Sequence, residues 1–457
     1  MCNGCKVKSE VNLISEYCEM IEAEDVVTEQ QYRENNVKRG LRDEDGKGVV
    51  VGLTRIGEIC SYNVIEGKTI SIPGELYYRG MEIKEIVKGF TENGRFGFEE
   101  TIYLLLFGRL PSKDQLEDFQ TYLSERRHLP EGFTNAMIMA PSSDMMHGLS
   151  ESVLSLYRYD ANPDSTSIEN VLKQCIGLIS VFPMLAVYGY RIFAHEFKKE
   201  SLFLHLPKPE YTVAENFFHM LRADSVFTKN EARLLDLSLV LHAEHGGGNN
   251  STFTTHVMTS TETDSYAVIS SALGSLKGPK HGGANIKVVQ MIEDIKQNVG
   301  DLKDDQEIEA YIRKILNKEA FDGSGKVYGM GHAVYTVSDP RNEILREHTA
   351  QLAKDKGLME EFQLYERIER IAPLVIVSEK KRSKSICANV DLYSGLLYKM
   401  LGIPLELFTA LFAIARVVGW SAHRLEGIKN KADLIRPAYI GIGSRSKYVP
   451  IEERKAL

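Results

Sequence analysis

The chain has 457 residues, of which 43% are hydrophobic and 26% charged, and its formal net charge is −8. This length exceeds one small domain, and the composition is typical of a soluble globular protein with a large core. The acidic balance gives no basic footprint for a nucleic acid. The six cysteines, at 2, 5, 18, 60, 175 and 387, form no disulfide framework, which favours a reducing compartment.

No secretory signal is predicted, because the first residues lack an apolar core. The most membrane-like stretch, residues 174–190, is shorter than the about 20 residues that a span needs, and Pro183 interrupts it. We therefore expect a buried helix here, no membrane association and a cytoplasmic location.

In chain order, residues 1–47 are polar, and their apolar positions follow helical spacing. This pattern predicts an amphipathic N-terminal extension. The pattern then changes, with short strand-like runs at 49–51, 69–72 and 76–79 separated by Gly, Pro and Asn turns. These runs predict a small β element.

After Gly80 almost every periodic segment is helical. There is no βαβ alternation, and none of the glycine-rich stretches continues as a phosphate-binding loop or follows a convincing strand. The fold class is therefore expected to be mainly α. Helices are predicted at 98–107, 112–126, 168–199, within 214–245, 251–259, 265–276, 284–298, 305–317, 342–347 and 405–420.

The most informative stretch is 329–341, which reads Gly-Met-Gly-His-Ala-Val-Tyr-Thr-Val-Ser-Asp-Pro-Arg. The glycines allow the backbone to pass close to a neighbour before His332. Asp339 suits a helix N-cap and Pro340 the first helical position, so Arg341 falls in the first turn. An imidazole and a permanent cation at one tight connection suit a substrate with a carbonyl and a carboxylate. The same residues also suit a plain glycine turn and a well-capped helix.

Two further motifs place a titratable group at a helix N-terminus. His281, in GPKHGGAN, precedes a predicted helix, where a neutral imidazole can donate a hydrogen bond to a developing oxyanion. Asp391, in NVDLYSG, stands at the head of an apolar helix. It could be a catalytic base, or an acid favoured only by the helix dipole.

Other candidates carry a weaker signal. His242 and His245 share one helical face and could bind a metal, although a hydrogen-bonding histidine beside glycines is the better interpretation. Arg416 lies inside an apolar helix, where it either extends to solvent or pairs with a buried anion. Arg436 precedes a proline in an extended segment, and the basic run 380–384 is either a solvated loop or a phosphate contact.

Together these groups suit one kind of chemistry. Two or more arginines suit a dicarboxylate, because a guanidinium binds a carboxylate in a bidentate manner. A carboxylate base with two histidine donors suits removal of a proton next to a carbonyl, stabilisation of the enol and polarisation of an acceptor carbonyl.

Three of these motifs resemble the signatures of the citrate synthase family: GMGHAVYTVSDPR, GPKHGGAN and NVDLYSG. GELYYRG and FEETIYLLLFGRLP are similar to the family's N-terminal half, and the resemblance extends from about residue 48 to the end. It implies a mainly α, two-domain homodimer with a small β element near the N-terminus. It also implies a large domain (48–282 and 403–457) and a small domain (283–402), whereas the N-terminal extension (1–47) has no clear counterpart in the family pattern.

The resemblance also implies residue roles. Asp391 would take the methyl proton of acetyl-CoA, His281 would donate to the thioester oxygen, and His332 would polarise the ketone of oxaloacetate. Citryl-CoA would then be hydrolysed, with no metal and no cofactor besides the coenzyme A thioester, as in the tricarboxylic acid cycle. Oxaloacetate would be held by His245, Arg341, Arg416 and, from the other subunit, Arg436, and coenzyme A phosphate by Lys384.

Some positions depart from the family pattern. Met330 stands where an aromatic residue is common, Glu244 replaces a frequent Asp, and Thr336 occupies a position that is often a coenzyme A-binding Arg or Lys.

The alternatives to a citrate synthase are a 2-methylcitrate synthase, which uses propionyl-CoA, a non-catalytic metabolite-binding relative, and a structural protein. The substrate of 2-methylcitrate synthase has one methylene more than acetyl-CoA, and the sequence does not show whether the pocket accommodates it.

Overall fold

The computed structural model describes residues 10–43, 47–65, 68–380 and 385–454, and the chain divides into two compact units, Met1–Gly52 and Leu53–Leu457. The first unit contains α1 (Glu10–Glu22), α2 (Glu29–Glu34) and the short 3-10 turn η1 (Arg39–Leu41). The helical pattern predicted for the N-terminal extension is thus confirmed. The Cys2–Cys5 motif lies outside the described residues.

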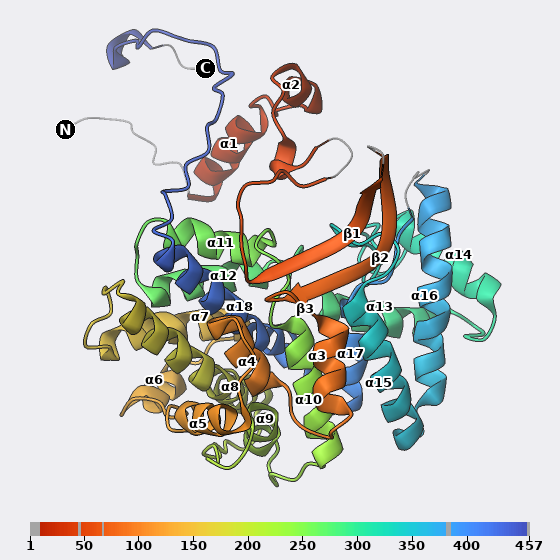
Figure 1. Cartoon of the computed structure of the whole chain (residues 1–457). Coiled ribbons are helices and arrows are strands. Elements are labelled where there is room, and N and C mark those ends of the chain that lie inside the picture. The colour runs from red at the N-terminus through yellow and green to blue at the C-terminus, as the bar shows by residue number, and fades with distance from the viewer. Residues whose placement is uncertain (1–9, 44–46, 66–67, 381–384, 455–457) are drawn as a thin grey trace. The chain divides into compact units, whose positions relative to one another are not determined.

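The second unit begins with a three-stranded antiparallel sheet in the order β1 (Gly57–Ile65), β2 (Lys68–Tyr78) and β3 (Met81–Glu82) (Figure 1). The predicted β element is confirmed, with two corrections. Residues 49–51 form no strand: they are exposed, and Val49 makes a single backbone hydrogen bond, to the Leu41 carbonyl (2.9 Å), rather than a ladder. The run 69–72 and residues 76–78 of the next run belong to one strand, which continues through Pro73 and Gly74 where the pairing with β1 shifts register.

The rest of the unit is helical, as predicted, and the fold class is mainly α. Gly108 ends α4 in the left-handed conformation, and the Ser112 hydroxyl caps the start of α5. The segment 214–245, for which at least one long helix was expected, contains α10 and most of α9. The helices are α3 (Ile83–Thr91), α4 (Phe98–Phe107), α5 (Lys113–Ser124), α6 (Phe133–Met139), α7 (Met145–Leu156), α8 (Ile168–Lys198), α9 (Val213–Leu221), α10 (Lys229–His242), α11 (Asn250–Thr259), α12 (Ser265–Lys277), α13 (Ala284–Asn298), α14 (Asp305–Leu316), α15 (Pro340–Lys356), α16 (Met359–Glu379), α17 (Asp391–Met400) and α18 (Phe408–Lys429), with 3-10 turns η2 (Tyr157–Tyr159), η3 (Leu405–Leu407) and η4 (Ile451–Glu453).

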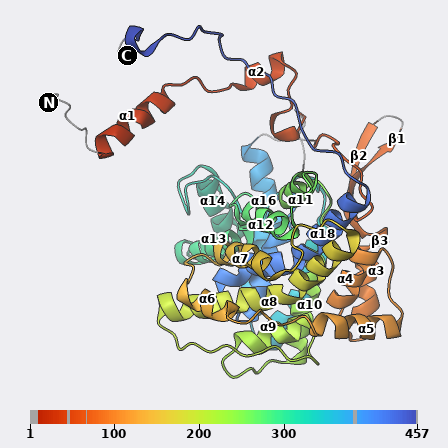
Figure 2. The same ribbon diagram turned by 90° about the vertical axis from the view of Figure 1, so that its left-hand side faces the viewer.

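Two long apolar helices, α8 and α18, pack against each other at the centre of the core. Both are long and apolar enough to cross a membrane, but 83% and 89% of their most apolar stretches are buried inside the protein. The burial explains their composition, since a helix apolar on all sides fits a protein core. Figure 2 shows α8 and α18 enclosed by neighbouring helices.

Helices α13 to α17 gather on one side of the same unit (Figure 1). There α15 packs on α17, α14 on α16 and α13 on α17. The sites of interest lie where the N-termini of α15 and α17 meet the ends of α10 and α18. The boundaries at 282/283 and 402/403 between a large and a small domain stay a prediction.

Candidate active site

Two turns that carry titratable groups are joined by backbone hydrogen bonds. Gly331 N–H donates to the Cys387 carbonyl (2.8 Å), and Asn389 N–H donates to the Gly329 carbonyl (2.9 Å). Gly329 and Gly331 have φ of 80° and 87°, in the left-handed region that suits glycine. A Cβ at Gly329 would also press on Leu392 at 3.2 Å. The two backbone hydrogen bonds place the turn before His332 directly beside the turn before Asp391.

The hydrogen bonds of His332 determine which nitrogen carries its proton. Its Nδ1 accepts from the backbone N–H of Val334 (3.0 Å) and of Tyr335 (3.1 Å). A backbone N–H can only donate, so in the neutral ring the hydrogen lies on Nε2. The ring stacks on Tyr335 at a centroid distance of 4.6 Å. His332 is therefore oriented to donate through Nε2.

His281 carries its proton on the other nitrogen. Its Nε2 lies 2.9 Å from the Ser251 hydroxyl and accepts from the Ser251 backbone N–H at 3.4 Å. Trp420 Nε1 in turn donates to the Ser251 hydroxyl (3.2 Å). Burial, with the charge of Arg416 as a second cause, lowers the pKa of His281 to about 4. The ring is thus neutral at pH 7, and Nδ1–H is its donor.

His245 follows α10 directly and is buried. Its ring lies edge-on to His332, with centroids 5.0 Å apart, and 5.6 Å from the ring of Tyr335. Burial, followed by the charge of Arg341, lowers the pKa of His245 well below its ordinary value. Its Nε2 has no hydrogen-bond partner among the described residues. Such a neutral, unpartnered nitrogen is available to a bound ligand.

Arg341 is held by a neighbour in its own first turn. Asp339 caps α15 and binds Arg341 Nε (3.0 Å) and Nη2 (2.7 Å). Pro340 occupies the first helical position, so the predicted N-terminus of this helix is confirmed. Burial alone would raise the pKa of Asp339, but Arg341 outweighs it and the pKa falls below its ordinary value. Asp339 also accepts from the Val390 N–H (3.2 Å), which ties Arg341 to the Asp391 turn.

Arg416 is buried inside α18, as predicted for a lone arginine in an apolar helix. Its Nε donates to the His242 carbonyl (2.8 Å), and the guanidinium lies 4.7 Å from the ring centroid of Phe412. Burial lowers the pKa of Arg416 to about 10, so it stays charged at pH 7. Its Nη2 is buried without a hydrogen-bond partner among the described residues. A buried, half-satisfied cation is strained unless an anion binds it.

Asp391 is the first residue of α17 and keeps part of its surface exposed. Removal of water around its carboxyl raises the pKa of Asp391 to about 7, although the charge of Arg341 opposes the shift. A carboxyl with a pKa near the working pH has the protonation behaviour that a general base needs.

The structure thus brings six predicted residues into one region: His245, His281, His332, Arg341, Asp391 and Arg416. Arg436 is not among them, because it is exposed in the extended segment after α18. Lys384 and its neighbours 381–383 lie outside the described residues. His242 donates through Nδ1 to the Ser238 carbonyl, and in the described ranges no three His, Cys, Asp or Glu side chains form a metal-binding group.

Sequence reasoning missed three partners of these residues. Ser251 lies 30 positions from His281, and nothing in the sequence links the two. Asp339 was expected only as a cap, although its position two residues before Arg341 makes the ion pair understandable in retrospect. Tyr335 stacks on His332 within the same turn and could have been considered.

A mainly helical fold that joins a carboxyl of raised pKa, neutral imidazoles and buried arginines suits an enzyme that performs carbon-acid chemistry. The sequence profile "Citrate synthase, C-terminal domain" matches residues 43–438. The chain belongs to the citrate synthase family.

Three similar proteins illustrate the relationship. The citrate synthase of Synechocystis sp. is 35% identical over 390 residues, covering 83% of this chain and 88% of that protein. The 2-methylcitrate synthase of Shewanella oneidensis is 31% identical, covering 84% and 94%. The citrate synthase of Thermoplasma acidophilum, solved with carboxymethyl coenzyme A and oxaloacetate, is 28% identical with a TM-score of 0.73, covering 91% of this chain and 99% of that one.

Proposed function

We propose that this chain is a citrate synthase that condenses acetyl-CoA with oxaloacetate and hydrolyses citryl-CoA to citrate and coenzyme A. The observation that carries the proposal is the pair of backbone hydrogen bonds between the two turns, which places Asp391, with its pKa of about 7, beside His332. Family membership supports the reaction class.

The geometry suggests how the steps are shared. Asp391, ionised, takes a proton from the acetyl methyl group, while His281 Nδ1–H donates to the thioester oxygen and stabilises the enol. His332 Nε2–H donates to the oxaloacetate ketone and polarises it. The enol carbon then attacks the ketone carbon, and water cleaves the thioester to release coenzyme A. The developing charges meet hydrogen-bond donors and guanidinium groups of the protein, so we propose no cofactor besides the thioester.

Oxaloacetate would lie between His245, Arg341 and Arg416. Two of these offer groups without a partner: His245 Nε2 and Arg416 Nη2 are both buried and have no hydrogen-bond partner among the described residues. Arg341 presents its remaining nitrogen, Nη1, because Asp339 occupies the other two. A dianion would satisfy these groups together.

We further propose a homodimer in which Arg436 completes the site of the partner subunit. The segment from Leu434 to Ile451 is extended and exposes large apolar side chains, among them Tyr439 and Tyr448. Such a segment suits contact with another copy of the chain. Mixing Arg436→Ala subunits with His332→Ala subunits would then restore one intact site per heterodimer, and exchanged dimers without activity would count against a shared site.

Two further proposals concern coenzyme A binding and the location of the protein. Lys384 would bind a coenzyme A phosphate, since Thr336 provides no cation at a position where the family often has one. The protein would act in the cytoplasm, in the tricarboxylic acid cycle.

The direct test is a steady-state assay of free coenzyme A released from oxaloacetate with acetyl-CoA and, in parallel, with propionyl-CoA. A higher kcat/KM with acetyl-CoA supports citrate synthase. A higher value with propionyl-CoA would instead assign the 2-methylcitrate synthase activity of the relative from Shewanella oneidensis. Release with neither thioester would refute the proposed function.

A further inference from the structure

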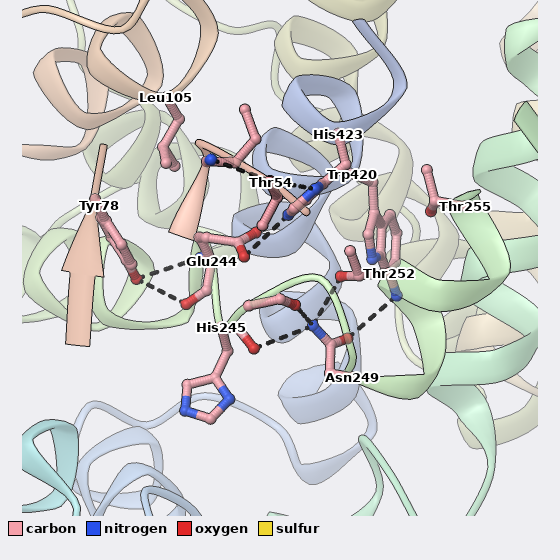
Figure 3. Close-up of polar contacts among 12 residues, drawn as sticks. Thr54, Tyr78, Leu105, Glu244, His245, Asn249, Thr252, Thr255, Trp420 and His423 are labelled. Carbon is pink, nitrogen blue, oxygen red and sulfur yellow. Dashed lines mark hydrogen bonds and ion pairs between the residues drawn. The ribbon is translucent and has the colours of Figure 1, made fainter. Parts of the chain in front are cut away.

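A fully buried ion pair lies directly behind His245. Glu244 Oε1 is 3.1 Å from His423 Nε2, and neither side chain has exposed surface. His423 lies on α18, seven residues after Arg416. In Figure 3 the ring of His245 points away from Glu244, toward the site, while the Glu244 carboxylate points to His423. The pair is thus one residue from a proposed substrate ligand and takes no part in the steps described above.

His423 donates to Glu244 through Nε2. The carboxylate oxygen Oε1, 3.1 Å away, can only accept, so the hydrogen of Nε2 points at Glu244. On the other side of the ring, Nδ1 lies 3.4 Å from the Thr54 hydroxyl, which donates to Glu426 Oε2 at 2.6 Å. The ring is thus held between Thr54 and Glu244, with Nε2 directed at the carboxylate.

Two glycines make room for the longer Glu side chain at a position where the family often has Asp. A Cβ at Gly57 would lie 2.8 Å from Glu244 Oε1, and a Cβ at Gly419 would collide with Glu244 Oε2. Tyr78 holds the backbone at the same point, since its hydroxyl donates to the Glu244 carbonyl at 3.0 Å. The carboxylate is thus accommodated by the surrounding chain and directed to one partner.

If His423 did not hold the Glu244 carboxylate, the cation available to that carboxylate would be Arg416. Its charge acts on Glu244, yet no ion pair joins the two among the described residues. Burial alone would raise the pKa of Glu244, but His423 and then Arg416 outweigh it and the pKa falls below its ordinary value. The guanidinium keeps Nη2 without a partner. Glu244 is therefore ionised, close to Arg416 and held by His423.

We propose that His423 is a positioning residue that retains the Glu244 carboxylate and so keeps Arg416 available to a carboxylate of the substrate. Without the hydrogen bond from His423, Glu244 would be a buried carboxylate that has lost its side-chain partner, and it would pair with Arg416. The substrate carboxylate would then have to displace Glu244 from Arg416. This inference rests on the proposed function, because it takes Arg416 as an oxaloacetate ligand.

Other charged or titratable groups face the pair from the surrounding elements. His256 on α11 lies with its ring 4.9 Å from that of His423, and burial, with the charge of His423 next, lowers its pKa to about 4. It is thus neutral at pH 7. The others are Glu426 and Arg416 on α18, Tyr78 at the end of β2 and Arg79 in the turn after it.

The test measures the KM for oxaloacetate and kcat from about pH 6 to about pH 8.5. In His423→Gln, Glu244 loses the partner that lowers its pKa, so that pKa rises: the carboxyl is protonated at the acid end of the range, and the carboxylate competes for Arg416 at the alkaline end. We expect KM to rise about tenfold at the alkaline end, with less increase at the acid end and kcat within about threefold of wild type. The double variant Glu244→Gln/His423→Gln should return KM to within about threefold and abolish its pH dependence, because two amides pair without charge.

Two single variants serve as controls. His256→Gln removes a ring that contacts His423 but keeps the hydrogen bond between His423 and Glu244, and it should leave KM and its pH dependence unchanged. Glu244→Gln removes the competitor and should also leave KM within about threefold of wild type, which keeps the inference testable if His423→Gln does not fold. A tenfold increase of KM in Glu244→Gln would overturn the inference.

The double variant distinguishes positioning from a purely structural role. If it restores thermal stability but not KM, the pair only supports the fold. Failure of the proposed function is a separate result, since it is read from wild-type coenzyme A release. If wild type does not turn over, calorimetric titration of the same variants with oxaloacetate decides the inference, and absence of binding by wild type refutes both.

Discussion

The raised pKa of Asp391 predicts that the proposed catalytic base destabilises the folded protein at neutral pH. Its surroundings favour the protonated form, with a pKa of about 7 in the folded chain against an ordinary value of 3.8. The folded state therefore binds this proton more tightly than the unfolded state. The cost is absent below pH 3.8, grows as pH rises through the interval, and is complete above about pH 7.

Asp391→Asn removes this cost, because an amide of the same shape carries no charge. A pKa rise from 3.8 to about 7 corresponds to about 4 kcal/mol at about 1.36 kcal/mol per pKa unit. Because part of the side chain is exposed, solvent screens the effect, and we expect a gain in the free energy of unfolding of about 1–3 kcal/mol at about pH 8. At about pH 5 the gain should be less than about half of that. At the same time kcat should fall by at least about a hundredfold.

Denaturant unfolding of both proteins at about pH 5 and about pH 8, followed by the coenzyme A release assay, tests this reasoning. Asn389→Ser is a useful control, since it alters the same turn without removing a charge. Equal stability of Asp391→Asn and wild type at both pH values would show that the carboxyl is not desolvated in the fold. Near wild-type turnover would refute its role as the base.

Four further predictions address the same site. The kcat/KM for acetyl-CoA should fall about tenfold per unit as pH decreases below about 7, because the base is active only when ionised; a profile flat to about pH 5 would contradict the raised pKa of Asp391. Ser251→Ala should lower kcat about tenfold in the steady-state assay and leave oxaloacetate binding unchanged, since the hydroxyl it removes contacts His281, Trp420 and Asn249 but none of the proposed oxaloacetate ligands. Gly74→Ala should reduce stability by about 1–3 kcal/mol together with activity, because a Cβ would collide with the Ser338 carbonyl and the Tyr335 ring, whereas Gly89→Ala, with open space around it, should be harmless. A non-reactive acetyl-CoA analogue should bind more tightly with saturating oxaloacetate in calorimetry, and oxaloacetate should gain the same factor from the analogue; equal affinities would exclude coupling between the substrates.

The local features of this protein follow from its sequence because they depend on neighbours along the chain. Asp339 and Pro340 start α15, Gly108 ends α4, and residues 284–298 form a helix with the predicted bounds. In each case the cap, the proline or the periodicity lies within a few residues of the effect. The motifs around His281, His332 and Asp391 identified the family in the same way, as short patterns of residue types.

The two errors in the β element have the same origin. Residues 49–51 have strand composition but form no strand ladder, and β2 continues through Pro73 and Gly74 where its pairing with β1 shifts register. Strand formation depends on a partner that can lie anywhere in the chain, so composition alone does not decide it.

Only the tertiary structure decided the protonation and the partners of the candidate catalytic groups. The hydrogen on Nδ1 of His281 and on Nε2 of His332, the capture of Arg341 by Asp339 in the bidentate geometry, and the pairing of Glu244 with His423 depend on atoms brought together by folding. Glu244 and His423 are 179 residues apart, and their charge states depend on burial that no local pattern reports. The sequence by itself therefore determined which side chains are present and the helices that carry them, whereas packing determined their protonation, their partners and their orientation.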